Sequence, residues 1–231
     1  MSDAPNYGET WVYESIVGAL PGVNFGERGA IALQIAIFET AVLFFAWVYD
    51  LWTAALAGTA AIVVAAVGSV VMLRMGERTR AAAVPTPYRR LLFGSSIEVV
   101  LGILAFVALV THLFVFDPRQ STTPLVTVLF GPDPPIVVVY LMLLILWDLC
   151  YRIGTSWWAA VVGLWGALRY RFDEPTAREM RRVNLLNVGF GVTQVLLVPF
   201  ILDQPILLLA VSGHVVAVTV VSVTAAALIR T

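Results

Sequence analysis

The chain is dominated by apolar blocks of at least about 20 residues in which charged side chains are rare. A hydrocarbon core of about 30 Å takes about 20 residues of helix to cross. Apolar residues make up 60% of the 231 residues and charged residues only 13%, whereas soluble domains average about 45–50% apolar and 25% charged. The pattern predicts an all-α, polytopic helical bundle that lies in the membrane.

The block boundaries predict about six spans: 29–50, 52–73, 91–116, a fourth that begins at residue 136, 183–202 and 206–229. The fourth segment is ambiguous, because residues 136–169 would form a helix of about 51 Å. Asp148, Arg152 and a Gly154-Thr155-Ser156 patch interrupt it. It can be read as one long helix, or as two short spans that bring the total to seven.

The arginines decide between these topologies, because basic residues concentrate on the cytoplasmic side of membrane proteins. With six spans and a cytoplasmic N-terminus, Arg119 alone of the 14 arginines is outside, and Arg152 lies at or near the inner interface. Seven spans would divide the arginines equally between the two sides. We therefore expect six spans in the cell membrane, with both termini cytoplasmic.

The domain organisation follows from the same blocks. Residues 1–28 form a cytoplasmic N-terminal segment, with a short helix over 9–20 that we expect to lie on the membrane surface. Residues 29–231 form a single transmembrane domain with short loops, too short for a soluble catalytic domain. The apolar run 124–130 is expected to fold back as a lid or a re-entrant piece.

Several chemistries are excluded by the composition. All 14 basic residues are arginines, so no Schiff base to retinal or pyridoxal phosphate can form. The sequence has no zinc-binding HExxH motif, and its one cysteine, Cys150, allows no intrachain disulfide. A net charge of −1 does not favour nucleic acid. We expect no cofactor and no metal, and an enzyme is the less favoured reading.

Carboxylates within the spans are the first candidates for function, because a charge in the bilayer core costs about 3 kcal/mol or more. Glu39 lies near the middle of the first span, and Asp50 follows eleven residues later on the same helix face. Glu98 lies in the third span, on a stripe of small residues that ends at His112. These side chains predict a proton or cation pathway, or else hydrogen bonds between helices.

Further polar side chains lie in the last two spans. Gln194 shares a face of the fifth span with Asn184 and Asn187, and His214 lies in the sixth. Glu39, Glu98 and Gln194 occupy related positions in alternate spans, which suggests three repeated two-helix hairpins. In the transport hypothesis Gln194 completes the site, and His112 or His214 relays protons.

Two other patterns favour structural roles. Asp148 and Arg152 are four residues apart, in the favourable order for an ion pair on a helix, and we interpret them as a structural ion pair or a gate. Small residues recur every fourth position along one face of the second span, at Ala57, Ala61, Ala65 and Ser69. Such a face allows helices to approach closely, within one chain or between the chains of a homo-oligomer.

These features favour a transporter or channel for a proton, a cation or a small solute. The main alternative is a non-catalytic scaffold or accessory subunit of a membrane complex, because no sharp catalytic motif is present. A haem-binding subunit that uses His112 and His214 is disfavoured, since the two residues are expected to differ in depth by about 6 Å. A lipid-modifying enzyme has no support beyond Asp148, Tyr151 and Arg152.

Overall fold

The computed structural model describes residues 10–12 and 27–231, and within them six helical segments are long and apolar enough to cross a membrane. The expected N-terminal surface helix over 9–20 lies almost entirely outside these residues. The elements are α2 (Glu27–Tyr49), α3 (Trp52–Ala81), α4 (Thr86–Phe93), α5 (Ile97–Thr111), the π-helix η1 (His112–Phe116), α6 (Asp117–Gln120), α7 (Leu125–Phe130), α8 (Ile136–Arg169), α9 (Glu174–Thr193), the 3₁₀-helix η2 (Gln194–Phe200) and α10 (Pro205–Leu228).

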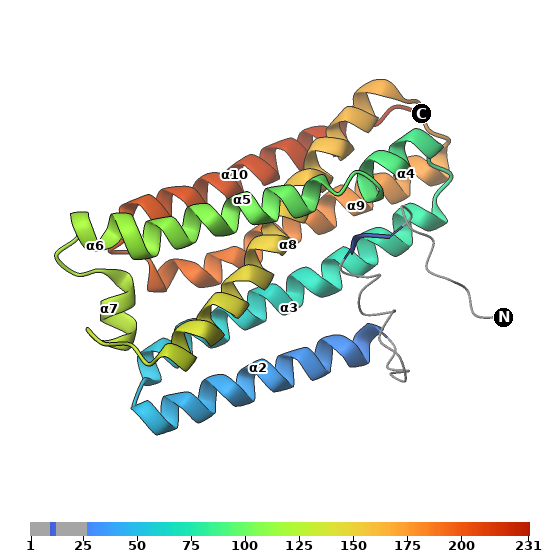
Figure 1. Ribbon diagram of the computed structural model, residues 1–231. Coiled ribbons are helices and arrows are strands. Elements are labelled where there is room, and N and C mark those ends of the chain that lie inside the picture. The colour runs from blue at the N-terminus through green and yellow to red at the C-terminus, as the bar shows by residue number, and fades with distance from the viewer. Residues whose placement is uncertain (1–9, 13–26) are drawn as a thin grey trace.

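The spans form three consecutive antiparallel hairpins (Figure 1): α2 with α3, α4–α5 with α8, and α9 with α10. The last two hairpins and α3 make up the body of the bundle. By contrast, α2 packs mainly on α3 and presents large apolar side chains such as Ile37, Phe44 and Trp47 on its exposed face. The predicted six-span all-α bundle is confirmed, and the protein is a multi-pass membrane protein.

The fourth span is one uninterrupted helix, so the seven-span alternative is wrong. Asp148, Arg152 and the Gly154-Thr155-Ser156 patch lie inside α8 without breaking it. Thr155 donates its hydroxyl to the carbonyl of Tyr151, and Ser156 bonds the side chain of Asn187. Neighbouring helices and the helix backbone thus satisfy the polar groups that made this segment ambiguous.

The third span is broken, where the sequence predicted a continuous helix. The chain leaves the helical conformation at Gly94, Ser95 and Ser96, and Ser96 adopts a left-handed conformation with φ of 55°. The hydroxyl of Ser95 donates to the carbonyl of Leu91 and accepts from the amide of Ile97. The Gly-Ser-Ser run therefore supplies both the flexibility and the hydrogen bonds that end α4 and begin α5.

One end of the bundle holds the C-terminal ends of α3, α8 and α10 and the start of α9 (Figure 1). We call it the basic end, because the helices and connections that meet there carry the exposed residues Arg74, Arg90, Arg169, Arg182 and Arg230. The long helices reach further toward it than predicted, because α3 continues to Ala81 and α9 begins at Glu174. The opposite end carries α6 and α7, and we call it the α7 end. The basic end is the end that we expected to face the cytoplasm.

Polar contacts join α8, α9 and α10 inside the bundle. The amide of Asn187 donates to the carbonyl of Ser156 and to the hydroxyl of Ser222, and accepts from the hydroxyl of Ser156. Asn187 is 1% exposed. Because every polar atom of this amide has a partner, Asn187 holds helices together rather than lining a path.

Trp11 packs into the basic end and is 2% exposed. Its ring meets that of Phe93 edge to face, with centroids 5.0 Å apart. The N-terminal segment is thus anchored in the bundle at Trp11, where the sequence predicted a contact with the membrane surface.

Candidate functional site

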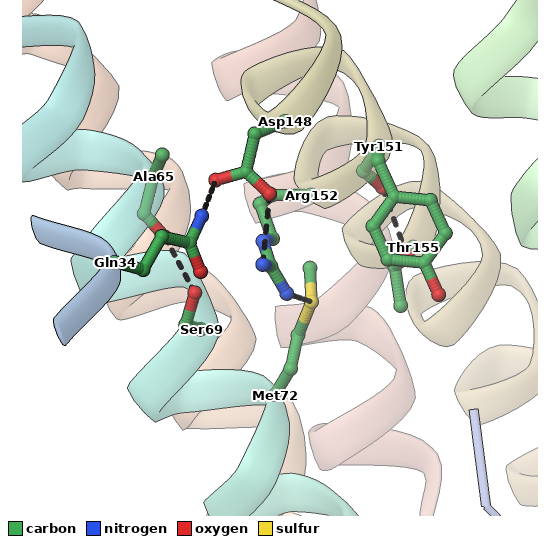
Figure 2. Close-up of polar contacts among 8 residues, drawn as sticks. All are labelled: Gln34, Ala65, Ser69, Met72, Asp148, Tyr151, Arg152 and Thr155. Atoms are coloured by element: carbon green, nitrogen blue, oxygen red, sulfur yellow. Dashed lines mark hydrogen bonds and ion pairs between the residues drawn. The ribbon is translucent and has the colours of Figure 1, made fainter. Parts of the chain in front are cut away.

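A polar network lies between α2, α3 and α8, in the interior of the bundle (Figure 2). Asp148 is its centre. One carboxylate oxygen accepts from Gln34 Nε2 at 3.0 Å, and the other accepts from Arg152 Nη2 at 2.9 Å. Arg152 is the 17th of the 34 residues of α8 and is 2% exposed, so it lies inside the bundle and not at an interface as expected.

The sequence of α8 produces this geometry directly, because residues four apart lie on one helix face. The Arg152 guanidinium also lies over the Tyr151 ring, 5.6 Å from its centroid, and its Nη1 is 3.8 Å from the sulfur of Met72. A buried guanidinium is tolerated where a carboxylate and soft or aromatic groups surround it. The network is electrically neutral overall and strongly dipolar.

An apolar cavity of about 190 Å³ lies next to this network, toward the α7 end. Ile145 lines both the cavity and a small pocket of about 20 Å³, which Gln34, Ser69 and Asp148 also line. The cavity is walled almost wholly by apolar side chains of α2, α3, α5, η1, α7, α8, η2 and α10. For scale, an apolar cavity of about 150 Å³ in another protein accepts benzene.

Helix α7 covers the cavity at the α7 end of the bundle. Val126, Leu129 and Phe130 line the cavity from this short helix, which is the apolar run that the sequence marked as a lid. The buried carboxylate of Asp117 accepts from the amide of Leu125 at 2.6 Å, and so holds the first turn of α7. Gln204, before α10, donates to the carbonyl of Thr123.

We expect Asp117→Ala to loosen α7 by about 1–3 kcal/mol, because a buried amide at its start loses its acceptor. Hydrogen exchange of residues 125–130 is the measurement, and exchange should accelerate there while the centre of α8 stays protected. Asp133→Ala, which alters an exposed carboxylate in the same connection, is the matched control. Equal exchange in both variants would contradict the role of Asp117.

The bundle is tightly closed on the basic side of the network. A Cβ atom on Gly154 would lie 2.6 Å from the backbone nitrogen of Gly102, so α5 and α8 touch through their backbones. Further toward the basic end, Gly166 similarly accommodates the ring of Tyr88. The apolar cavity and the backbone contact of α5 with α8 therefore lie on opposite sides of Asp148 and Arg152 along the bundle.

The structure places the predicted carboxylates apart from one another. Glu39 is the 13th of 23 residues in α2, is partly exposed, and accepts from the hydroxyl of Thr59 at 2.8 Å. Asp50 is exposed, just beyond the end of α2. Glu98 is fully buried on α5, and no described side chain donates a hydrogen bond to its carboxylate. No described contact connects these residues into a chain.

The other predicted residues are also separate. Gln194 is fully buried at the start of η2, and neither of its amide atoms has a hydrogen-bond partner among the described residues. His112 begins the π-helix η1, whereas His214 lies on α10 beside Trp157. The part of the chain that the structure describes contains no group of three or more residues suited to hold a metal ion.

Gln34 and the cavity are the parts of the site that the sequence did not reveal. The sequence did show that Gln34 is an amide side chain near the start of an apolar span. Nothing in the sequence indicated its partner, because Asp148 is 114 residues away. The small-residue face of α3 proved to be internal: Ala61, Ala65 and Ser69 are buried, and Ala61 lines the cavity. A homo-oligomer remains a prediction, and its chains would have to contact one another through other helix faces.

Comparison with known proteins extends over nearly the whole chain. Residues 6–225 match the model of a family of unknown function, DUF7530. No curated protein and no solved structure matches the chain. The chain belongs to the DUF7530 family, whose function is unknown.

Proposed function

We propose that the protein is a membrane transporter for a small amphipathic solute. The observation that carries this proposal is an apolar cavity on one side of a buried polar network, with α5 and α8 in backbone contact on the other side. Carriers alternate between states in which a central site is open to one side only. The arrangement corresponds to a state that is closed at the basic end.

The chemistry of the site defines the class of solute. Its apolar body would fill the cavity of about 190 Å³. Its polar group would reach Asp148 and Gln34, which line a pocket of about 20 Å³, close to the size of one water. A single amine, ammonium or hydroxyl group fits such a pocket. An ion without an apolar body gains nothing from the cavity, because an apolar wall does not replace its water of hydration.

Exchange into liposomes tests the proposal. The probes are radiolabelled L-leucine, isovalerate and 3-methylbutylamine, which share a branched apolar body and differ in charge. We expect exchange of at least one probe to exceed that of protein-free liposomes by about tenfold. Exchange at the protein-free rate for all three would contradict this proposal and favour an accessory-subunit role.

A second candidate is movement of a proton or cation through the carboxylates of Glu39 and Glu98. The observation in its favour is Glu98, which is fully buried and receives no hydrogen bond from any described side chain; the polar groups at its carboxylate are the backbone amides of Val12 and of Glu98 itself. Burying such a group costs free energy, and ionisable residues inside membrane spans often mark a functional site. A pH dye inside liposomes reports this activity, and Glu39→Gln and Glu98→Gln should each abolish it. An unchanged flux in both variants would rule these carboxylates out.

A further inference from the structure

A second open space lies on another side of the bundle, between α5, α8 and α10. This groove has a volume of about 330 Å³ and shares no lining residue with the apolar cavity. Small residues give it room, and two ring side chains give it polarity. Its lining comprises Leu101, Ala105, Ile153, Gly154, Trp157, Gly213, His214 and Ala217.

The two rings bring nitrogen atoms whose hydrogen bonds are not made. The centroids of Trp157 and His214 are 6.3 Å apart, and the rings are tilted by 53°. His214 Nε2 is buried and has no hydrogen-bond partner among the described residues. Within the same residues, the Trp157 indole makes no hydrogen bond either. An indole N–H can only donate, and a neutral imidazole carries one donor as well.

The position of the groove along the spans raises the free-energy cost of leaving these hydrogen bonds unmade. His214 is the tenth of 24 residues in α10, and Trp157 is the 22nd of 34 in α8. Both lie more than two helical turns from the nearer end of their helices, where the surroundings are hydrocarbon and water is absent. An unsatisfied polar group in such surroundings costs several kcal/mol.

The location also restricts what can satisfy the two rings. Phospholipid headgroups remain at the interface, roughly 15 Å from the bilayer centre. Acyl chains reach the groove but carry no hydrogen-bond acceptor at this depth. The occupant must therefore dissolve in the hydrocarbon core and bring an acceptor oxygen with it. A flat ring suits the space beside the Trp157 indole, because aromatic rings stack on one another.

We propose that this groove binds the ring of a lipid-soluble quinone. Its carbonyl oxygens are acceptors only, and so match the donors that Trp157 and His214 present. The flat ring lies against the indole, where Gly154 and Gly213 have no side chain that would fill the groove. This site is separate from the cavity of the proposed transporter and does not depend on that proposal.

The test uses 1,4-naphthoquinone and naphthalene, which have the same fused ring body and differ by two carbonyl groups. Both are titrated into the purified full-length protein in lipid nanodiscs, and the indole N–H resonances of the seven tryptophans are followed by NMR. Trp157→Phe identifies the resonance of Trp157. We expect naphthoquinone to shift this resonance and to bind at least about tenfold more tightly than naphthalene.

His214→Leu and Trp157→Phe should each weaken naphthoquinone binding by about tenfold while leaving naphthalene binding unchanged. His112→Leu, which removes the other histidine on a different helix, is the control and should bind as the wild type does. Equal affinity for the two probes in the wild-type protein would overturn the proposal. Wild-type affinity in both groove variants would overturn it too, and either result would indicate a groove filled by acyl chains.

Discussion

Gly154→Leu is expected to prevent assembly of the bundle. Even the first added carbon atom would lie 2.6 Å from the nitrogen of Gly102 and 3.0 Å from the carbonyl oxygen of Glu98, both backbone atoms of α5. Backbone atoms of a packed helix cannot rotate away as a flexible side chain can. The two helices must therefore separate along the most extensive interhelical contact in the bundle.

The measurement for Gly154→Leu is the yield of monodisperse protein by size-exclusion chromatography in detergent, followed by thermal unfolding. We expect almost no folded protein. Gly189→Ala is the matched control, because a Cβ atom there meets nothing within 4 Å and alanine favours a helix over glycine by up to about 1 kcal/mol. A Gly154→Leu protein that unfolds at the wild-type temperature would show that α5 and α8 do not touch as described.

Arg152→Met is expected to lower the free energy of unfolding by about 3–5 kcal/mol, because it leaves the Asp148 carboxylate inside the bundle without its countercharge. Only the amide of Gln34 would still donate to that carboxylate among the described hydrogen bonds. Methionine keeps much of the apolar volume of the arginine side chain, so loss of packing is a minor part of the effect. Denaturation in mixed micelles measures the change.

The double variant Arg152→Met/Asp148→Leu separates charge from packing. Removing both members of a buried pair is often close to neutral, so most of the lost stability should return. Arg178→Gln breaks the exposed pair with Glu174, which is also four residues apart, and should cost no more than about 1 kcal/mol. If Arg152→Met costs as little as Arg178→Gln, the network does not stabilise the bundle.

The number of spans could be predicted because the bilayer fixes the length of an apolar helix, whereas α3 and α9 extend beyond their predicted limits. Arginine placement correctly favoured a single fourth span over two, and α8 is continuous. The break in the third span was missed, although Gly94, Ser95 and Ser96 were visible in the sequence. A glycine and two serines are tolerated inside many membrane helices, so their presence did not by itself indicate that the helix ends there.

The candidate site was predictable only in part. The spacing of Asp148 and Arg152 indicated an ion pair, because that contact is local and follows from helix geometry. The contact with Gln34 joins two helices that are far apart in the sequence, and the cavity requires side chains from eight elements. Such features depend on how the helices cross, which one sequence does not specify. The predicted hairpin repeat rested on Glu39, Glu98 and Gln194. The structure places these three residues in different surroundings and indicates no role that they share.

The most direct test of the account is solute exchange by Ala61→Leu, a substitution on the cavity wall. The added carbon atoms should occupy the cavity and reduce exchange of the transported probe by about tenfold or more, with thermal stability unchanged or higher. Ala60→Leu, one residue away and outside the cavity lining, should exchange at the wild-type rate. Wild-type exchange by a folded Ala61→Leu protein would contradict the assignment of the cavity as the solute site.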